Sequence, residues 1–196
     1  MKTKIFAFLC LILVIPSLYA MPIVLKAISA GWDSTGYTPG GTAQLWVNGV
    51  DHSQHYRGMN VVVIDQFTGN VLNSNYYDTY AYSSSADAMA AFINALPSGR
   101  IVMIAAQDEP TQSMTSAGIN SLYTLGASSF NPGYRGSWAL IGIKGSAQGT
   151  QLQGTSARYS SAVILDKTME LVPEPSSLVF LLSSFVLFLA YKKAKR

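Results

Sequence analysis

Cysteine is almost absent from this sequence, and the position of the single one has consequences. Cys10 falls within an apolar run from Ile5 to Ile15, close to the N-terminus. If that segment is removed on export, the remaining protein has no thiol, and disulfides, cysteine-containing metal sites and thiol catalysis are all excluded. A lipoprotein cysteine would follow small residues, whereas Phe8 and Leu9 precede this one.

Charged side chains are also scarce, and many of the basic ones lie at the two ends of the chain. Between residues 21 and 172, seven basic residues face nine acidic ones, which gives a net charge of about −2. No basic patch typical of a nucleic-acid-binding surface remains, so nucleic acid is not an expected partner. The terminal lysines and arginines are instead typical of segments that stay on the cytoplasmic side of a membrane.

The first 20 residues contain the three parts of a secretory signal peptide. Lys2 and Lys4 form a basic start, the apolar run follows, and Ala20 supplies a small residue at the end. We predict cleavage after Ala20, although Leu18 is larger than the residue usually found at that distance from the cleavage point. The alternatives are a buried helix or a retained anchor, but the apolar run is short for a membrane span.

The C-terminal segment, residues 172–196, has a different three-part pattern. Pro173-Glu174-Pro175 precedes an apolar stretch from Leu178 to Tyr191, and a basic cluster ends the chain. Each proline disfavours helix immediately before it. The apolar stretch is short for a permanent span, so its periodicity leaves a membrane anchor and a core helix open. The basic cluster argues against a core helix.

This order of parts resembles the PEP-CTERM sorting signal of Gram-negative bacteria that produce exopolysaccharide. The resemblance implies that an exosortase-type enzyme processes the chain at the motif formed by Pro173, Glu174 and Pro175. It also implies that the C-terminal hydrophobic helix holds the chain in the inner membrane before processing. The product would then reach the cell envelope, the outer surface or the extracellular matrix.

Residues 23–168 are predicted to form one domain of strands and helices. Apolar runs and turn-bounded alternation predict strands at 23–28, 42–47, 59–65, 71–77, 101–106, 138–143 and 160–165. A helix is expected to begin at Ser84, which with Asp87 has the spacing of a capping box, and a weaker helix is expected over 113–125. The segment 145–156 is expected to be an exposed loop. This pattern predicts an α+β fold, with α/β as the alternative.

Several short phrases in this domain follow a specific order. They are Asn48-Gly49, residues 57–65, Thr68-Gly69, residues 77–80, residues 97–102, Gln107-Asp108-Glu109, Leu125-Gly126 and residues 134–145. This order is similar to that of the ILEI/PANDER domain (interleukin-like EMT inducer), over roughly residues 40–146. The resemblance implies a compact fold of two twisted β-sheets with about two flanking helices. The secreted animal members carry disulfides that this chain lacks, which argues against receptor signalling.

The resemblance also implies a set of binding residues. A non-catalytic, glycan-binding member of the family uses two arginines and an aspartate, and the matching positions here are Arg57, Asp108 and Arg135. Guanidinium groups and a carboxylate suit paired sugar hydroxyls, and Trp138 or Tyr134 would supply an aromatic face for the apolar side of a sugar ring. The alternative is that these charged residues form a structural ion-pair network that holds strand ends together.

The other polar residues give no complete catalytic or metal-binding set. His52 and His55 lie in one loop, and no third ligand is evident. Asp108 and Glu109 could be interpreted as the carboxylate pair of a glycoside hydrolase, but adjacent carboxylates do not by themselves flank a bond. Turn formation accounts for this segment better. We therefore expect no metal, no cofactor and no catalytic residues.

Taken together, the patterns favour an exported domain of the envelope or matrix that is not an enzyme and that binds a glycan or exopolysaccharide. One alternative is a structural or protein-interaction module of the extracellular matrix without a small ligand. A weak polysaccharide hydrolase is the third hypothesis.

Overall fold

The computed structural model describes residues 22–171 and residue 191, and Pro22–Met169 form one compact unit. The predicted signal peptide, the Pro173-Glu174-Pro175 motif and the C-terminal hydrophobic helix lie outside the described residues. Within the described part of the chain, no helix is long and apolar enough to cross a membrane.

Strands dominate the described residues, and two helices accompany them. In chain order the elements are β1 (Pro22–Gly31), β2 (Thr42–Val47), β3 (Val50–Asp51), β4 (Gly58–Ile64), β5 (Val71–Tyr77), α2 (Ser83–Ala95), β6 (Ile101–Asp108), α3 (Ser116–Tyr123), β7 (Ser137–Ile143), β8 (Leu152–Ser156) and β9 (Val163–Glu170). The expectation of a sheet-rich domain with two helices is confirmed.

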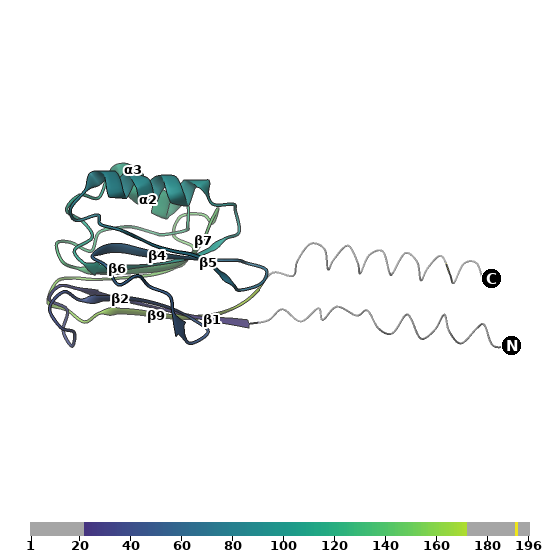
Figure 1. The fold of residues 1–196 in the computed structure, drawn as a ribbon, viewed down its shortest axis with the longest axis horizontal. Helices are drawn as coiled ribbons and strands as arrows, with labels where there is room; N and C mark the ends of the chain where they lie inside the picture. Colours follow the sequence, from purple (N-terminus) through teal and green to yellow (C-terminus); the bar gives the residue numbers. More distant parts are fainter. Residues whose placement is uncertain (1–21, 172–190, 192–196) are drawn as a thin grey trace. The chain divides into compact units, whose positions relative to one another are not determined.

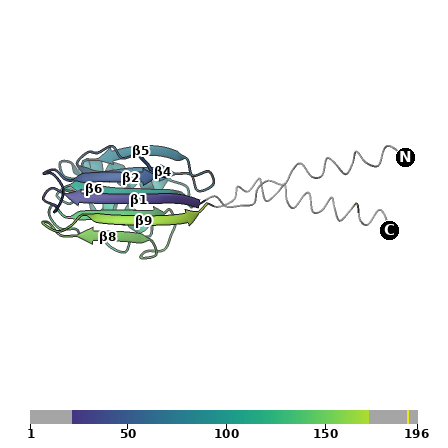
Figure 2. The same cartoon turned by 90° about the horizontal axis from the view of Figure 1, so that it is seen from below.

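The elements are arranged in three layers (Figure 1). The helices α2 and α3 lie over one face of a layer in which β5, β4, β6, β7 and β8 are neighbours in that order. Strands β3, β2, β1 and β9 form the next layer, where β1 lies between β2 and β9 (Figure 2). Two parallel residue pairs, Ala30 with Gln107 and Gly31 with Asp108, join β1 to β6. The strands are therefore one hydrogen-bonded sheet in two layers, whereas the family resemblance implied two sheets.

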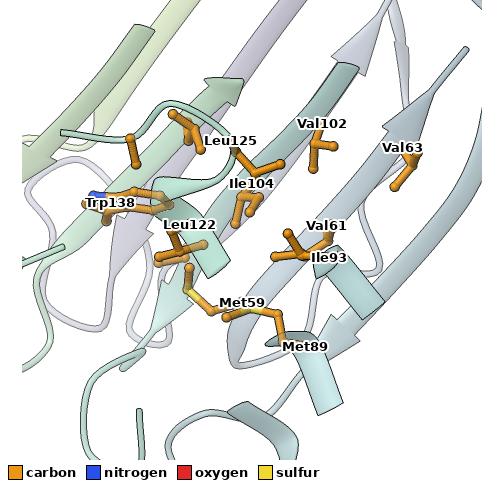
Figure 3. Close-up of a cluster of buried hydrophobic side chains, with 13 residues drawn as sticks. Met59, Val61, Val63, Met89, Ile93, Val102, Ile104, Leu122, Leu125 and Trp138 are labelled. Carbon is orange, nitrogen blue, oxygen red and sulfur yellow. The ribbon is translucent and has the colours of Figure 1, made fainter. Parts of the chain in front are cut away.

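The central strands are buried on both faces, as their apolar sequences predict. Every residue of β4 is buried, and so are the first six residues of β6. One face of these strands packs against the helices in a buried cluster that contains Met89 and Ile93 of α2, Met59 of β4 and Ile104 of β6 (Figure 3). A fully buried side chain of this size contributes roughly 1.5–3 kcal/mol to the stability of the fold. The core therefore fixes the positions at which β4 and β6 end.

Some predicted boundaries need correction. Helix α2 follows Tyr82, whose carbonyl accepts the Ser85 amide at 3.1 Å and whose side chain makes no cap bond, so the capping box predicted at Ser84 is wrong. The segment 145–156 is not a loop throughout, because residues 152–156 form β8 and pair with β7. Strand β8 escaped prediction because its sequence is polar and it lies at an edge, with Leu152 exposed. The last strand begins at Val163 instead of residue 160.

Candidate functional site

Arg57, Asp108 and Arg135 lie where the chain enters or leaves the central strands. Arg57 immediately precedes β4, Asp108 is the last residue of β6, and Arg135 lies two residues before β7. Strand β6 is antiparallel to both β4 and β7. The end of β6 therefore lies beside the starts of its two neighbours, and the topology brings the three residues to one end of the layer.

Two glycines allow the chain segments at this end to approach one another. Gly58 has a φ of +95°, and a Cβ there would lie 2.2 Å from the Tyr77 carbonyl oxygen. A Cβ on Gly31, the last residue of β1, would lie 2.0 Å from the carbonyl oxygen of Arg135. Only glycine fits such close approaches. The two glycines thus let the Arg57 and Arg135 segments pack tightly at the strand ends.

Arg57 is held by a carboxylate that the sequence analysis did not single out. Its Nε donates to Asp78 Oδ1 at 3.1 Å and its Nη2 donates to Asp78 Oδ2 at 2.7 Å. The guanidinium also lies over the Tyr80 ring, 4.5 Å from the centroid. The hydrogen bonds to Asp78 raise the pKa of Arg57. Burial alone would raise the pKa of Asp78, but the hydrogen bonds from Arg57 and from the Ala81 amide lower it.

Arg135 also has a carboxylate partner and aromatic neighbours. Its Nη1 lies 3.5 Å from Asp33 Oδ2. Its guanidinium carbon lies 4.9 Å from the Trp32 ring centroid and 5.3 Å from that of Tyr134, within the range of cation–π attraction. Tyr134 is exposed, so one aromatic face predicted for the site is available.

Asp108 differs from the other two, because its carboxylate accepts no hydrogen bond from the described residues. Partial burial raises its pKa above the ordinary value for aspartate. The positive charges of Arg57 and then Arg135 oppose this rise, and the negative charges of Glu109 and Asp78 add to it. Asp108 is thus a half-buried carboxylate within the electrostatic reach of two guanidinium groups whose closest partners are other aspartates.

The backbone at this end is fixed in an unusual conformation. Asp108 and Arg135 both have left-handed backbone angles, with φ of 62° and 57°. Such angles are uncommon outside glycine and cluster at functional sites. Buried Glu109 supports both residues, since one carboxylate oxygen accepts the Arg135 amide and the other accepts the Thr111 amide and hydroxyl. Glu109 therefore forms the turn that the sequence predicted for this segment.

Trp138 does not have the position that its predicted role requires. Its side chain is fully buried, its Nε1 donates to the Ser129 carbonyl at 3.1 Å, and Phe130 packs edge-on against its ring. A ring enclosed in this way has no free face for a sugar. Residues 134–138 therefore contain an exposed tyrosine, a candidate site arginine and a tryptophan that belongs to the core.

The histidine loop has a structural arrangement. Asp51 Oδ1 accepts the amides of Leu45 and Ser53, both at 3.0 Å, and Asp51 Oδ2 lies 3.3 Å from His55 Nε2. In the part of the chain that the structure describes, no group of three histidine, cysteine, aspartate or glutamate side chains could hold a metal ion.

Sequence comparison places most of this site within a known family. Residues 57–146 match the family described as Interleukin-like EMT inducer (ILEI), a match that begins at Arg57 and includes Asp108 and Arg135. The chain is 32% identical over 96 residues to the human "Cell migration-inducing and hyaluronan-binding protein". The aligned residues make up 48% of this chain and 7% of that protein. It is 37% identical over 89 residues to human "Cell surface hyaluronidase CEMIP2", covering 44% and 6%.

A third relative matches over a similar length. Human "Protein FAM3D" is 32% identical over 89 residues, which cover 45% of this chain and 39% of that protein. The chain thus spans less than half the length of each of these curated relatives. The match to the ILEI family is confined to residues 57–146, while β1, β2, β3, β8 and β9 lie outside it.

Proposed function

We propose that this ILEI-domain chain is a non-catalytic, glycan-binding protein whose site centres on Asp108. The observation that carries the proposal is the half-buried Asp108 carboxylate, which accepts no hydrogen bond from the described residues although Arg57 and Arg135 are near enough to influence its pKa. No buried side-chain oxygen of the described residues lacks a hydrogen-bond partner, so the Asp108 oxygens, which have none, are accessible from outside. A ligand that donates hydrogen bonds can therefore reach them.

Sugar hydroxyl groups match this arrangement. Two adjacent hydroxyls can donate to the two oxygens of Asp108 and accept from guanidinium N–H groups that their aspartate partners leave unused. Arg57 and Arg135 each have five N–H groups, and the bonds to Asp78 and Asp33 use only some of them. The exposed ring of Tyr134 is a surface for the apolar face of a sugar.

The arrangement of the carboxylates supports binding over hydrolysis. Glycoside hydrolysis usually needs two carboxyl groups that flank the bond to be cleaved. Glu109, the neighbour of Asp108, is buried and uses both of its oxygens to hold backbone amides. Asp33 and Asp78 are paired with arginines. None of these side chains is therefore positioned as a second catalytic acid for Asp108.

A structural or protein-interaction module is the second candidate function. Strand β5 pairs only with β4 among the described strands, and Leu72 and Tyr76 on it are exposed. An exposed edge of this kind can pair with a strand of another chain. Self-association that persists in Leu72→Lys and does not respond to sugars would argue against this edge as the interface.

The proposed setting is extracytoplasmic. One relative is named as a cell-surface protein and another as hyaluronan-binding, which supports a role for this domain at a polysaccharide-rich surface. The signal-peptide pattern of residues 1–20 and the Pro173-Glu174-Pro175 pattern support export followed by exosortase-type processing. Mass spectrometry of the protein recovered from its native cells would show whether the chain ends near residue 175.

The experiment that tests the function is an NMR titration of the full chain, in mild detergent, with a panel of neutral mono- and oligosaccharides. Saturable shifts are expected at Asp108 and in the segments that carry Arg57 and Arg135. In Asp108→Asn the affinity should fall at least about tenfold, because a hydrogen bond to a charged group contributes about 1.5–3 kcal/mol. Asparagine suits the test because it also tolerates the left-handed backbone at this position.

The matched control is Lys26→Gln. It removes a charged side chain from β1, where Lys26 Nζ lies 3.7 Å from Asp166 Oδ1 of β9. This variant should bind the sugars as the unaltered protein does. Absence of shifts at millimolar concentrations of every sugar would overturn the proposal and leave the interaction-module alternative.

A further inference from the structure

An arginine–aromatic cluster surrounds Asp33, and most of it lies outside the ILEI match. We call it the Arg158 cluster, and it consists of Trp32, Asp33, Tyr134, Arg135, Arg158 and Tyr159. Apart from Tyr134 and Arg135, its members come from the segments that follow β1 and β8, which the family match of residues 57–146 does not cover. Trp32, Asp33, Arg158 and Tyr159 therefore lie outside the matched region.

Two arginines share one carboxylate oxygen in this cluster. Asp33 Oδ2 accepts from Arg158 Nε at 2.7 Å and lies 3.5 Å from Arg135 Nη1. Two positive charges thus face a single negative charge. Each guanidinium group has five N–H donors, and no other hydrogen bond from either guanidinium group is formed within the described part of the chain. The two guanidinium groups therefore have N–H donors left for a ligand.

Aromatic rings hold the two guanidinium groups in place. Arg158 lies 4.5 Å from the centroid of the Tyr159 ring and 5.5 Å from that of Tyr134. Arg135 lies over the same Tyr134 ring and over Trp32. Tyr134 and Tyr159 are exposed, with 47% and 65% of their surface accessible. A ligand can therefore reach both the aromatic rings and the guanidinium groups.

Backbone contacts attach this cluster to the site at Asp108. The Trp32 amide donates to the Asp108 carbonyl at 3.1 Å. Thr35 binds the segment that follows β8. Its amide donates to the Ser160 carbonyl at 2.9 Å and its hydroxyl donates to the Tyr159 carbonyl at 3.1 Å. The Arg158 cluster and the site at Asp108 are thus neighbouring parts of one fixed surface, and Arg135 belongs to both.

We propose that the Arg158 cluster is a second sugar subsite that binds the carboxylate of an acidic sugar unit, adjacent to the unit held at Asp108. Planar guanidinium groups bind carboxylates through paired hydrogen bonds, and the exposed tyrosines provide the stacking surface that a pyranose ring needs. The inference rests on the proposed glycan-binding function and specifies its ligand, a polymer that contains uronic acid.

The test compares two matched pairs of oligosaccharides by isothermal titration of the full chain in mild detergent. The probes are a hyaluronan octasaccharide and a tetragalacturonate, each with its counterpart in which every carboxyl group is reduced to a primary alcohol. At least one acidic probe should bind about tenfold more tightly than its reduced counterpart, as expected for hydrogen bonds to a charged group. The preference should decrease as sodium chloride is added, because the guanidinium groups are partly exposed and salt screens their charge.

Arg158→Gln should remove most of the preference for the acidic probe and change the affinity for the reduced probe less than about twofold. Lys26→Gln removes the same charge from another surface and should preserve the preference. Equal affinity for acidic and reduced probes in the unaltered protein, or no binding of any of the four, overturns the inference. Binding of neutral sugars at Asp108 is measured separately by the NMR titration. Failure of the Arg158 subsite and failure of the site at Asp108 therefore give different results.

Discussion

The two ends of the central strands contain the same residue types and differ in how those residues are bonded. An arginine precedes and an aspartate ends or follows each strand: Arg57 and Asp65 for β4, Arg100 and Asp108 for β6. Since the strands are antiparallel, Gly58 pairs with Gln107 and Ile64 with Ile101. Each end of the pair therefore has one arginine and one aspartate from opposite strands.

At the end that contains Asp65 the pair is complete. Asp65 accepts from Arg100 and also from the amides of Phe67 and Thr68, both at 2.9 Å. Burial alone would raise the pKa of Asp65, but the two amides and Arg100 together lower it below the ordinary value. The Gln66 side chain accepts a further bond from Arg100 at 2.7 Å. This end of the strands is a closed structural network.

At the other end, Asp78 bonds the arginine that would otherwise pair with Asp108. Arg57 makes both of its hydrogen bonds to Asp78, and Asp108 is left with a raised pKa and no hydrogen bond from the described residues. The comparison shows that residue type and strand position alone do not determine whether a strand-end carboxylate is paired. The two ends differ in whether the hydrogen-bonding capacity of the carboxylate is used within the protein, and the proposed binding site rests on that difference.

The largest expected effect concerns stability at the closed end. Asp65→Ala removes three hydrogen bonds and leaves Arg100 partly buried without its partner, so the free energy of unfolding should fall by about 3 kcal/mol. Urea denaturation followed by tryptophan fluorescence would measure this, since Trp138 is buried in the core. Sugar affinity of the folded variant should not change. A stability equal to that of the unaltered protein would contradict the description of this end as structural.

A pH titration should separate Asp108, which has no hydrogen-bond partner among the described residues, from the paired carboxylates Asp65 and Asp78. Asp108 has a raised pKa, and its ionised form accepts the sugar hydroxyls, so affinity should decrease as the pH falls through a value above the ordinary aspartate pKa of about 3.9. Asp65 and Asp78 have lowered pKa values, so their contribution to stability is complete above the ordinary pKa and is lost only as the pH falls through the lower folded values.

Sugar binding should therefore weaken at a pH where thermal unfolding of the unliganded protein is still unchanged. Calorimetric binding and melting temperatures measured across the same pH series would check the order. If binding and stability decrease together, the loss of affinity reflects unfolding and not protonation of Asp108.

The smallest expected effect is on stability in Asp108→Asn. The raised pKa means that ionised Asp108 opposes folding slightly at neutral pH, so the neutral amide should leave the free energy of unfolding within about 0.5 kcal/mol of the original, or increase it. The urea assay used for Asp65→Ala provides the direct comparison. A loss of several kcal/mol would place Asp108 in the structural class with Asp65.

The sequence predicted the parts of the fold that depend on local hydrophobic pattern. Strands β2 and β5 coincide with the predicted ranges, and β4 is a run of buried residues as expected. Strand β8 was not predicted because a polar edge strand has no apolar alternation, and its pairing with β7 depends on the folded sheet. The start of α2 was misplaced because the predicted cap, Ser84, lies within the first turn of the helix.

The candidate site was likewise predictable from the sequence only in part. The resemblance pointed to Arg57, Asp108 and Arg135, and antiparallel pairing brings them to one end of the layer. Their partners, Asp78 and Asp33, lie 21 residues from Arg57 and 102 residues from Arg135 along the chain, so no local pattern connects them. The burial of Trp138 was missed for a similar reason, because only packing against Phe130 and the helices encloses its ring.

The buried carboxylate of Glu109 also affects the entropy of ligand binding. By holding the amides of Thr111 and Arg135 it orders the segments on both sides of the site during folding. Restricting one backbone residue costs roughly 1–2 kcal/mol of conformational entropy. Because that cost is met when the chain folds, a ligand of the proposed site would meet a preorganised surface, and less of its binding energy would be spent on ordering the protein.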